Sequence, residues 1–135
     1  MSGWDMYISG ASGLMNRGPI QKAGIFGING ATWAQHDINP IYQELISIKD
    51  LFTLPDKGYT EGFSLGGKRY ALLRVDDEEI LHGRGKTAGG ESPNAITIQK
   101  TKQALIIGIG TEEASGGEVS MAVGAIGDHL ARAGY

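Results

Sequence analysis

The last stretch of the chain has the clearest hydrophobic pattern. Between residues 118 and 135, four apolar residues recur at intervals of four, three and four positions: Val119, Val123, Ile126 and Leu130. This spacing places them on one stripe of an α-helix, and such a stripe must face a core. Ser-Gly-Gly at positions 115–117 and Gly134 are the start and stop signals of that helix. We therefore predict a closing helix that packs on the rest of the fold.

Two further helices are predicted nearer the N-terminus. The first opens at Ser2 and Asp5, which have the form of a capping box, and ends in the 13–18 region. One face of it carries Trp4, Tyr7, Ile8, Ala11 and Met15. The second opens at Asn39 as the N-cap and Pro40 as the first helical residue, and residues 54–58 close it. Its buried stripe comprises Ile41, Leu45, Ile48 and Phe52.

The remaining runs have the composition and period of β-strands. Asn29-Gly30 separates two β-prone runs, 23–28 and 31–35, and predicts a hairpin with a type I′ turn. Five more runs follow at 62–65, 70–75, 79–83, 95–99 and 103–109. Their connections are too short for crossover helices, so the sheet should be antiparallel, with the wholly apolar run near 105–109 at its centre. The expected fold is α+β, in one domain spanning residues 1–135.

Composition narrows the class of protein. The 135 residues are 41% hydrophobic and 20% charged, as in ordinary soluble domains. No run approaches the roughly 18 apolar residues of a membrane span, and no signal-peptide pattern opens the chain. The absence of cysteine excludes disulfides and thiolate metal sites, and a cytoplasmic location is the default expectation. The net charge of −3 argues against a nucleic-acid partner.

Positive charge gathers in the middle of the chain. Seven of the twelve basic residues lie between positions 68 and 102: Lys68, Arg69, Arg74, Arg84, Lys86, Lys100 and Lys102. One interpretation is a set of solvated strand faces, which the acidic run at 76–79 partly offsets. The other is a local basic face for an acidic partner or an anionic lipid.

Apparent catalytic and metal motifs fail on context. Residues 62–66 match the G-x-S-x-G nucleophile elbow, but a strand follows them where that motif needs a helix. The Gly-Lys-Thr at 85–87 lacks the first glycine of a phosphate loop, because position 80 is Ile80. The three histidines, at positions 36, 82 and 129, do not have zinc-ligand spacing. We therefore expect neither enzymatic activity nor a cofactor or metal.

The few aromatic residues allow two interpretations. Trp4, Tyr7, Trp33 and Tyr135 avoid the predicted core stripes or lie near the chain ends. They could simply cover the sheet beneath the terminal helices. Alternatively they form an exposed groove for a polyproline II segment, whose preformed helix offers carbonyls to Trp N–H and Tyr O–H donors.

The sequence resembles profilin, the small actin-monomer-binding protein, from end to end. The matching marks are Ser2-Gly-Trp4 with Tyr7, Thr32-Trp33-Ala34, Leu65-Gly-Gly-Lys-Arg69, the run 103–109, and His129-Leu130 with Tyr135. The resemblance implies a central antiparallel sheet, with the terminal helices together on one face and the 40–52 helix on the other. It also implies a groove for proline-rich segments, such as those of formins, formed by Trp4, Tyr7, Trp33, His129, Leu130 and Tyr135.

The resemblance further implies a face that binds monomeric actin, formed by Tyr59, Arg69, Leu72, Arg74, Arg84, Lys86, Ser120 and Met121. Of these, Arg69, Arg74, Arg84 and Lys86 are also expected to bind phosphatidylinositol phosphates at a membrane surface. Animal profilins carry a basic and an aromatic residue where Met121 and Gly124 stand, so part of the actin contact is missing here. The expected function is an adaptor that regulates actin polymerisation in the cytoplasm and cytoskeleton. The alternative is a proline-rich-peptide or phosphoinositide-binding module with weak or no actin binding.

Overall fold

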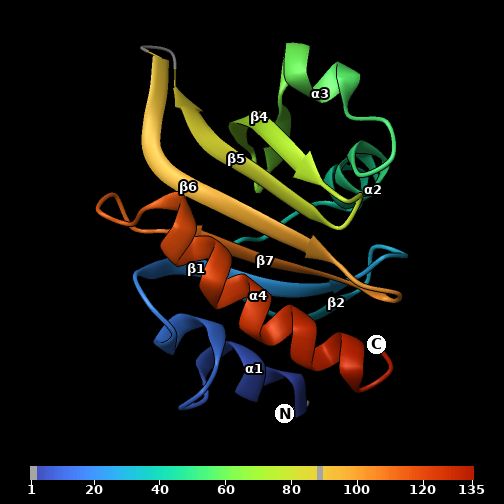
Figure 1. Cartoon of the computed structure of the whole chain (residues 1–135), viewed down its shortest axis with the longest axis vertical. Coiled ribbons are helices and arrows are strands. Elements are labelled where there is room, and N and C mark those ends of the chain that lie inside the picture. Colours follow the sequence, from blue (N-terminus) through green and yellow to red (C-terminus); the bar gives the residue numbers. More distant parts are fainter. Residues whose placement is uncertain (1–2, 88–89) are drawn as a thin grey trace.

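The computed structural model describes residues 3–87 and 90–135. In this part of the chain, seven strands form one antiparallel sheet in the order β2-β1-β7-β6-β5-β4-β3 (Figure 1). The strands are β1 (Ile20–Gly27), β2 (Thr32–His36), β3 (Phe63–Leu65), β4 (Lys68–Asp76), β5 (Ile80–Thr87), β6 (Gly90–Lys100) and β7 (Ala104–Gly110). The predicted hairpin and five-strand meander are both confirmed, and β7 joins them by pairing with β1.

The apolar strand β7 lies inside the sheet because both of its faces are covered. Leu105 and Ile107 pack into the core on one face, while Ala104 and Ile106 pack into the core on the other. All residues of β7 are buried. A strand with two covered faces reads as a continuous apolar run, so the predicted central position is confirmed.

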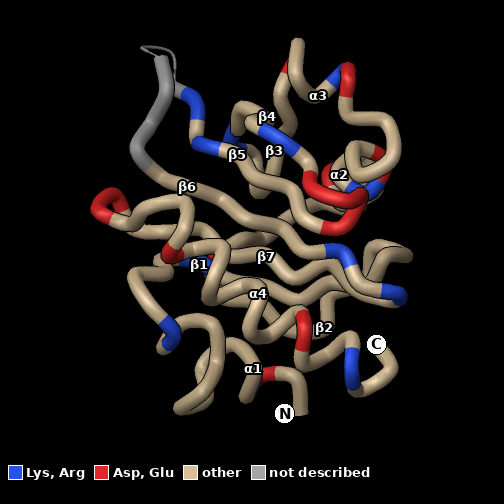
Figure 2. Tube along the Cα trace, in the orientation of Figure 1, with Lys and Arg blue, Asp and Glu red and all other residues tan. Residues whose placement is uncertain are grey.

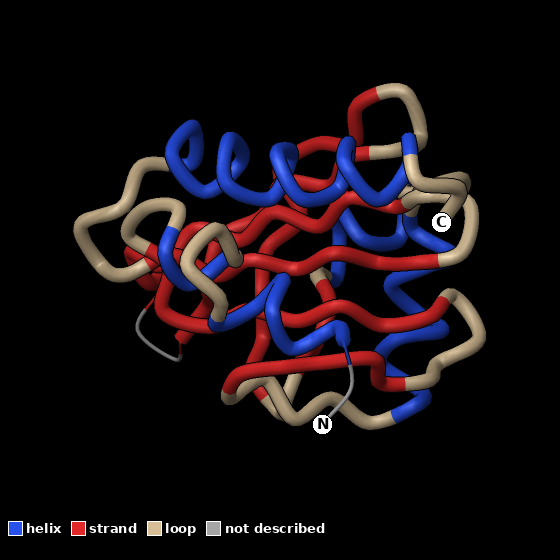
Figure 3. The backbone as a smooth tube through the Cα atoms, turned by 90° about the horizontal axis from the view of Figure 1, so that it is seen from below, coloured by secondary structure: helices blue, strands red, loops and turns tan. Residues whose placement is uncertain are grey.

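Helices cover the two faces separately. The α2-side core lies beneath α2 (Tyr42–Leu51) and α3 (Asp56–Glu61), and contains Leu45 and Ile48. The α4-side core lies beneath α4 (Gly116–Arg132), the short helix α1 (Met6–Ser9) and the 3-10 helices η1 (Gly3–Asp5) and η2 (Leu14–Asn16). In Figure 3, α4 and the N-terminal helical segment both cross in front of the strands. The predicted division of the terminal helices and α2 between opposite faces is confirmed.

Glycines on β7 set how closely α4 packs on the sheet. A Cβ built on Gly108 would lie 2.6 Å from Val123 Cγ2, and one on Gly110 would lie 2.6 Å from Val119 Cγ2. Both contacts are far shorter than side-chain packing allows, so only glycine permits this approach. The predicted stripe of Val119, Val123, Ile126 and Leu130 is buried as expected.

The hairpin exists, but its turn differs from the predicted type. Gly30 N–H donates to Gly27 O at 2.9 Å, and Gly27 N–H donates to Ala31 O at 2.7 Å, so the loop holds three residues. Of the Asn29-Gly30 pair, only Gly30 has a positive φ, of 91°, whereas a type I′ turn needs both. The Asn29 side-chain oxygen accepts from Ala31 N–H at 3.1 Å, which stabilises the longer loop.

The start of α2 lies two residues later than predicted. Asn39 adopts a φ of 50° and its N–H donates to Gln35 Oε1 at 2.6 Å, a conformation that an N-cap does not have. Ile41 occupies the N-cap instead, and its N–H donates to Glu44 Oε1 at 3.0 Å. Ile41 is therefore 63% exposed, and its predicted place in the buried stripe is wrong.

Two further segments depart from expectation. The predicted N-terminal helix is broken, because the chain leaves the helical conformation at Gly10 and leaves Ala11 exposed. Its predicted cap, Ser2, lies outside the described residues. Helix α3 forms where a closing loop was expected; its Gly58 packs against Leu51 and Leu72, and a glycine contact gives no apolar signal in the sequence. No helix within residues 3–87 and 90–135 is long and apolar enough to cross a membrane.

Candidate binding sites

Five aromatic rings meet at one end of the α4-side face. Trp4 lies at the centre, with ring centroids 4.6 Å from Trp33, 4.9 Å from Tyr135 and 5.6 Å from Tyr7. The ring of His129 lies 5.7 Å from that of Tyr7. These rings come from η1, α1, β2, α4 and the residues after α4, so the fold brings together positions spread over the whole chain. We call these five residues the aromatic cluster.

The aromatic cluster is partly packed and partly exposed. Trp4, Tyr7 and Trp33 are half-buried against the α4-side core, which supports the packing interpretation. Tyr135 is 38% exposed and His129 is exposed, so one side of the cluster still faces solvent. Leu130 is fully buried in the α4-side core beneath it. The two interpretations of the sequence therefore both describe part of this surface, and the six predicted positions lie in one region.

The end of α4 returns Tyr135 to the aromatic cluster. Gly134 takes a φ of 98°, a conformation that L side chains rarely adopt. Tyr135 N–H donates to Leu130 O at 2.9 Å and Gly134 N–H to Ala131 O at 3.2 Å. This pair of bonds is a Schellman motif, and it confirms Gly134 as the predicted stop signal.

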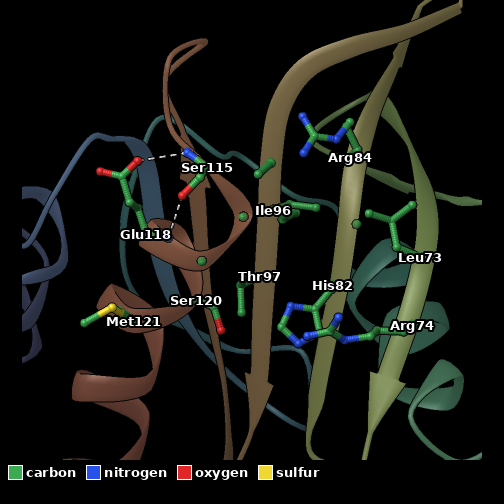
Figure 4. Close-up of a pocket in the computed structure, with 14 residues that line it drawn as sticks. Leu73, Arg74, His82, Arg84, Ile96, Thr97, Ser115, Glu118, Ser120 and Met121 are labelled. Atoms are coloured by element: carbon green, nitrogen blue, oxygen red, sulfur yellow. Dashed lines mark hydrogen bonds between the residues drawn. The ribbon is translucent and has the colours of Figure 1, made fainter.

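A cavity of roughly 630 Å³ lies between strands β4–β6 and the N-terminal half of α4. Four residues of the expected actin-binding face line it: Arg74, Arg84, Ser120 and Met121. Leu73, His82, Thr97 and Glu118 line it as well (Figure 4). In Figure 4, Arg74 and His82 lie side by side, and Leu73 lies near Arg84. The cavity thus combines cations with exposed apolar side chains, since Leu73 is 50% and Met121 79% exposed.

A family model described as profilin matches residues 2–135. The chain belongs to the profilin family. Profilins are actin-binding and polyproline-binding proteins without enzymatic activity.

Solved profilins have the same fold over nearly the whole chain. Profilin IA of Acanthamoeba castellanii is 24% identical, with a TM-score of 0.83, and the match covers 98% of this chain and 100% of that one. Schizosaccharomyces pombe profilin is 24% identical with a TM-score of 0.81, over 98% of this chain and 100% of that one. Mouse profilin IIa, solved in complex with a double repeat from the FH1 domain of mDia1, is 24% identical with a TM-score of 0.81, over 99% of this chain and 100% of that one.

A β-bulge decides which residues of β4 face the profilin cavity. Leu72 pairs with Gly83 and Arg74 with His82, so Leu73 is an extra residue in the ladder. Leu72, expected on the actin-binding face, lies in the α2-side core as Tyr70 does two residues before it, and is only 6% exposed. Leu73 faces outward, and the bulge turns Arg74 outward beside it, where a regular strand would turn Arg74 toward the core. The sequence contains a signal for this bulge, because Leu-Leu-Arg at 72–74 interrupts the two-residue period.

The other expected contact residues lie outside the cavity. Arg69 donates from Nη1 to Ser64 Oγ at 2.8 Å and also bonds the Glu61 carbonyl, so its head group is held at the β3–β4 edge. Lys86 is exposed on β5, and it lies opposite Arg69 of β4 in the register of the sheet. Tyr59 is 50% exposed on α3. The structure thus divides the expected set into a cavity group and an edge group.

Asp76 binds two of the basic side chains of the cavity, those of Arg74 and His82. Its Oδ2 accepts from Arg74 Nε at 3.2 Å and lies 3.0 Å from His82 Nε2. Desolvation raises the pKa of Asp76, but the hydrogen bonds and charges of His82 and Arg74 outweigh it and leave the pKa below its usual value. Figure 2 shows the basic residues along β4 and β5 and the acidic residues at the turn that joins them. The sequence gives no signal for a role of His82 at this site, because a lone histidine in a strand has no ligand spacing.

We expect Asp76→Asn to lower the free energy of unfolding at neutral pH. Because the pKa of Asp76 is lowered in the folded state, its contribution is present above about pH 4 and is lost as the pH falls through the folded pKa. Urea denaturation of both proteins should therefore give a difference that is largest at neutral pH and disappears once the pH is below the pKa of Asp76 in the folded protein.

The matched control is Asp77→Asn, the same substitution one residue along in the same turn. Asp77 has a φ of 52°, which asparagine also tolerates. This variant should not show the pH-dependent difference. An equal, pH-independent loss in both variants would contradict the assigned role of Asp76.

Proposed function

We propose that this profilin-family chain is an adaptor that regulates actin polymerisation. It binds monomeric actin on the cavity face and proline-rich segments on the aromatic cluster. The observation that carries the proposal is the convergence of Trp4, Tyr7, Trp33, His129 and Tyr135 over the buried Leu130, far along α4 from the cavity residues Ser120 and Met121. We also propose that the protein acts in the cytoplasm and at the cytoskeleton.

The aromatic cluster suits a polyproline II helix. The proline rings of such a segment can stack on Trp4 and Trp33. Because the segment has no internal hydrogen bonds, its carbonyl groups remain available to hydrogen-bond donors of the protein. Because the segment is already extended before binding, it loses little conformational entropy. The mouse relative solved with an FH1 repeat supports proline-rich partners of the formin type for this chain as well.

Trp4→Ala should weaken binding of a proline decamer by at least about tenfold. Truncating an aromatic residue at the centre of a binding surface costs roughly 2 kcal/mol or more. Fluorescence titration can follow binding in the variant because Trp33 remains as reporter. Tyr59→Ala, which removes an exposed aromatic residue from α3, is the control and should bind as the wild type does. A folded Trp4→Ala protein with unchanged affinity would contradict the proposed use of the aromatic cluster.

The cavity suits a protein surface that offers both apolar and acidic groups. Leu73 and Met121 are exposed apolar side chains on different elements, and Arg74 and Arg84 supply positive charge between them. We propose these four, with Ser120, as the centre of the actin-binding face, and Arg69, Lys86 and Tyr59 as its periphery. Met121 and Gly124 replace the basic and aromatic residues of animal profilins, which favours reduced affinity for animal actin. A module with weak or no actin binding is therefore the second candidate function.

The two surfaces should be independent. His129 follows Met121 by eight positions on α4, which at 1.5 Å per residue is about 12 Å along the helix axis. We expect Met121→Glu to weaken binding of monomeric actin by about tenfold or more, because the new carboxylate would be desolvated in the complex. Polyproline binding should not change. Tyr135→Ala should have the reverse effect on the two ligands.

Sedimentation velocity with labelled actin measures the first effect and fluorescence titration the second. The control for Met121→Glu is Leu54→Glu, which places the same charge on another exposed apolar residue, 75% exposed and outside the cavity. It should leave both ligands bound normally. If saturating proline decamer displaces actin, the two surfaces are not independent.

We further propose that the basic face of β4 and β5 binds phosphatidylinositol phosphates through Arg69, Arg74, Arg84 and Lys86. Each cation near an anionic surface contributes about 1 kcal/mol, reduced by salt. Lys86→Ala should therefore weaken co-sedimentation with vesicles of phosphatidylcholine and phosphatidylinositol bisphosphate about fivefold at low salt. Lys49→Ala on α2, the opposite face, should have no effect. Binding that does not respond to salt would contradict this mechanism.

A further inference from the structure

Tyr135 is the one member of the aromatic cluster that belongs to no helix or strand. Trp4 lies on η1, Tyr7 on α1, Trp33 on β2 and His129 on α4, so each of these rings is positioned by a regular element. Tyr135 follows the end of α4 at Arg132. Its ring nevertheless stands edge-on to Trp4, with 4.9 Å between centroids and 80° between planes, and 6.1 Å from Trp33. Something outside α4 must hold the backbone that carries this ring.

The turn between β6 and β7 supplies that contact. The main-chain oxygen of Tyr135 accepts from Gln103 N–H at 2.6 Å and from Thr101 Oγ1 at 3.0 Å. The Gln103 side chain donates to the preceding carbonyl, that of Gly134, at 3.4 Å. The backbone of residues 134–135 is thus fixed both to α4, through the Schellman motif, and to the β6–β7 turn.

Thr101 is placed for this contact by its own hydrogen bonds. Its hydroxyl accepts from Ala104 N–H at 3.1 Å, which fixes the orientation of the side chain. The single hydroxyl proton has two acceptors in reach, Tyr135 O at 3.0 Å and Ala104 O at 3.4 Å, and the shorter contact takes it. Thr101 is buried, at 8% exposure, so water competes little for this bond.

We propose that Thr101 is a positioning residue for proline-rich ligands: its hydroxyl binds the main-chain oxygen of Tyr135 and thereby helps to hold the Tyr135 ring against Trp4. The inference rests on the proposed polyproline function and extends it to a residue in the β6–β7 turn, outside the aromatic cluster. Without the bond, Tyr135 O keeps the Gln103 N–H but loses its second donor, so the residue is held less tightly and its ring must be ordered further when a ligand binds.

A purely structural role for Thr101 makes a different prediction. The same hydroxyl satisfies the buried Ala104 N–H, so its loss also weakens the turn. A weakened turn would lower the affinity for proline-rich ligands by the same factor whether or not the Tyr135 ring is present. The positioning role, in contrast, acts through Tyr135 and must disappear when that ring is removed.

The test is a double-mutant cycle measured by fluorescence titration with a proline decamer. Thr101→Val keeps the shape of the side chain and removes the hydroxyl, and it should weaken binding about three- to tenfold, the range for one lost hydrogen bond. Thr101→Ser keeps the hydroxyl and should bind within about twofold of the wild type. In the Tyr135→Ala background, Thr101→Val should cause no further loss, because the two residues act as one unit.

A second measurement needs no ligand. In the NMR spectrum of the wild-type protein, the ring protons of Tyr135 should be shifted by the neighbouring Trp4 ring, and Thr101→Val should move them toward the values of an unstructured tyrosine. Wild-type affinity and unchanged Tyr135 signals in Thr101→Val would overturn the inference. So would an equal loss of affinity in both backgrounds. If the wild-type protein itself does not bind the decamer, the proposed function fails, whereas the Tyr135 signals still decide whether Thr101 positions the ring.

Discussion

The close packing of α4 on β7 is the contact on which both candidate sites depend. Gly108 and Gly110 leave room for Val123 and Val119. A Cβ atom at either glycine would clash with these side chains, so α4 could not lie this close to β7. The helix contributes a matching gap, because a Cβ on Gly127 would lie 2.5 Å from the Gln99 side chain of β6. Gln99 Nε2 in turn donates to Asp128 on α4 at 2.9 Å. A helix seated this firmly can offer its first turns to the cavity and its last turns to the aromatic cluster.

Much of the fold can be predicted from the sequence because buried positions are occupied by apolar residues at regular intervals. The stripe of α4 and the continuous apolar run of β7 each identify their element and its surroundings. Turns and helix starts are harder, because individual polar side chains decide them. The Gln35 side chain that bonds Asn39 and the Glu44 side chain that bonds Ile41 shift the start of α2, and neither contact follows from propensity. The sequence of helix α3 has little hydrophobic pattern, because the residue that it buries is a glycine.

The candidate sites show the same division. The aromatic positions could be identified from residue type and family resemblance, and the fold brings them together. The cavity could be identified only in part. Arg74 and Arg84 are visible as charges, but the outward orientation of Arg74 depends on a bulge, and the contribution of His82 depends on its bond to Asp76. The contact that supports Tyr135 is the hardest to predict from the sequence, because it links residues 101 and 135 through a main-chain oxygen.

The bulge in β4 also affects how this chain should be aligned with other profilins. Before Leu73, residues Tyr70 and Leu72 point toward the α2-side core, and after it Val75 does so, so the phase of the strand changes by one residue. A relative that lacks the extra residue would need a gap at this position for its side chains to match in orientation. An ungapped comparison would pair outward-facing positions with inward-facing ones over half of the strand. Evolutionary changes in surface charge on this strand should therefore be compared after superposition of the structures.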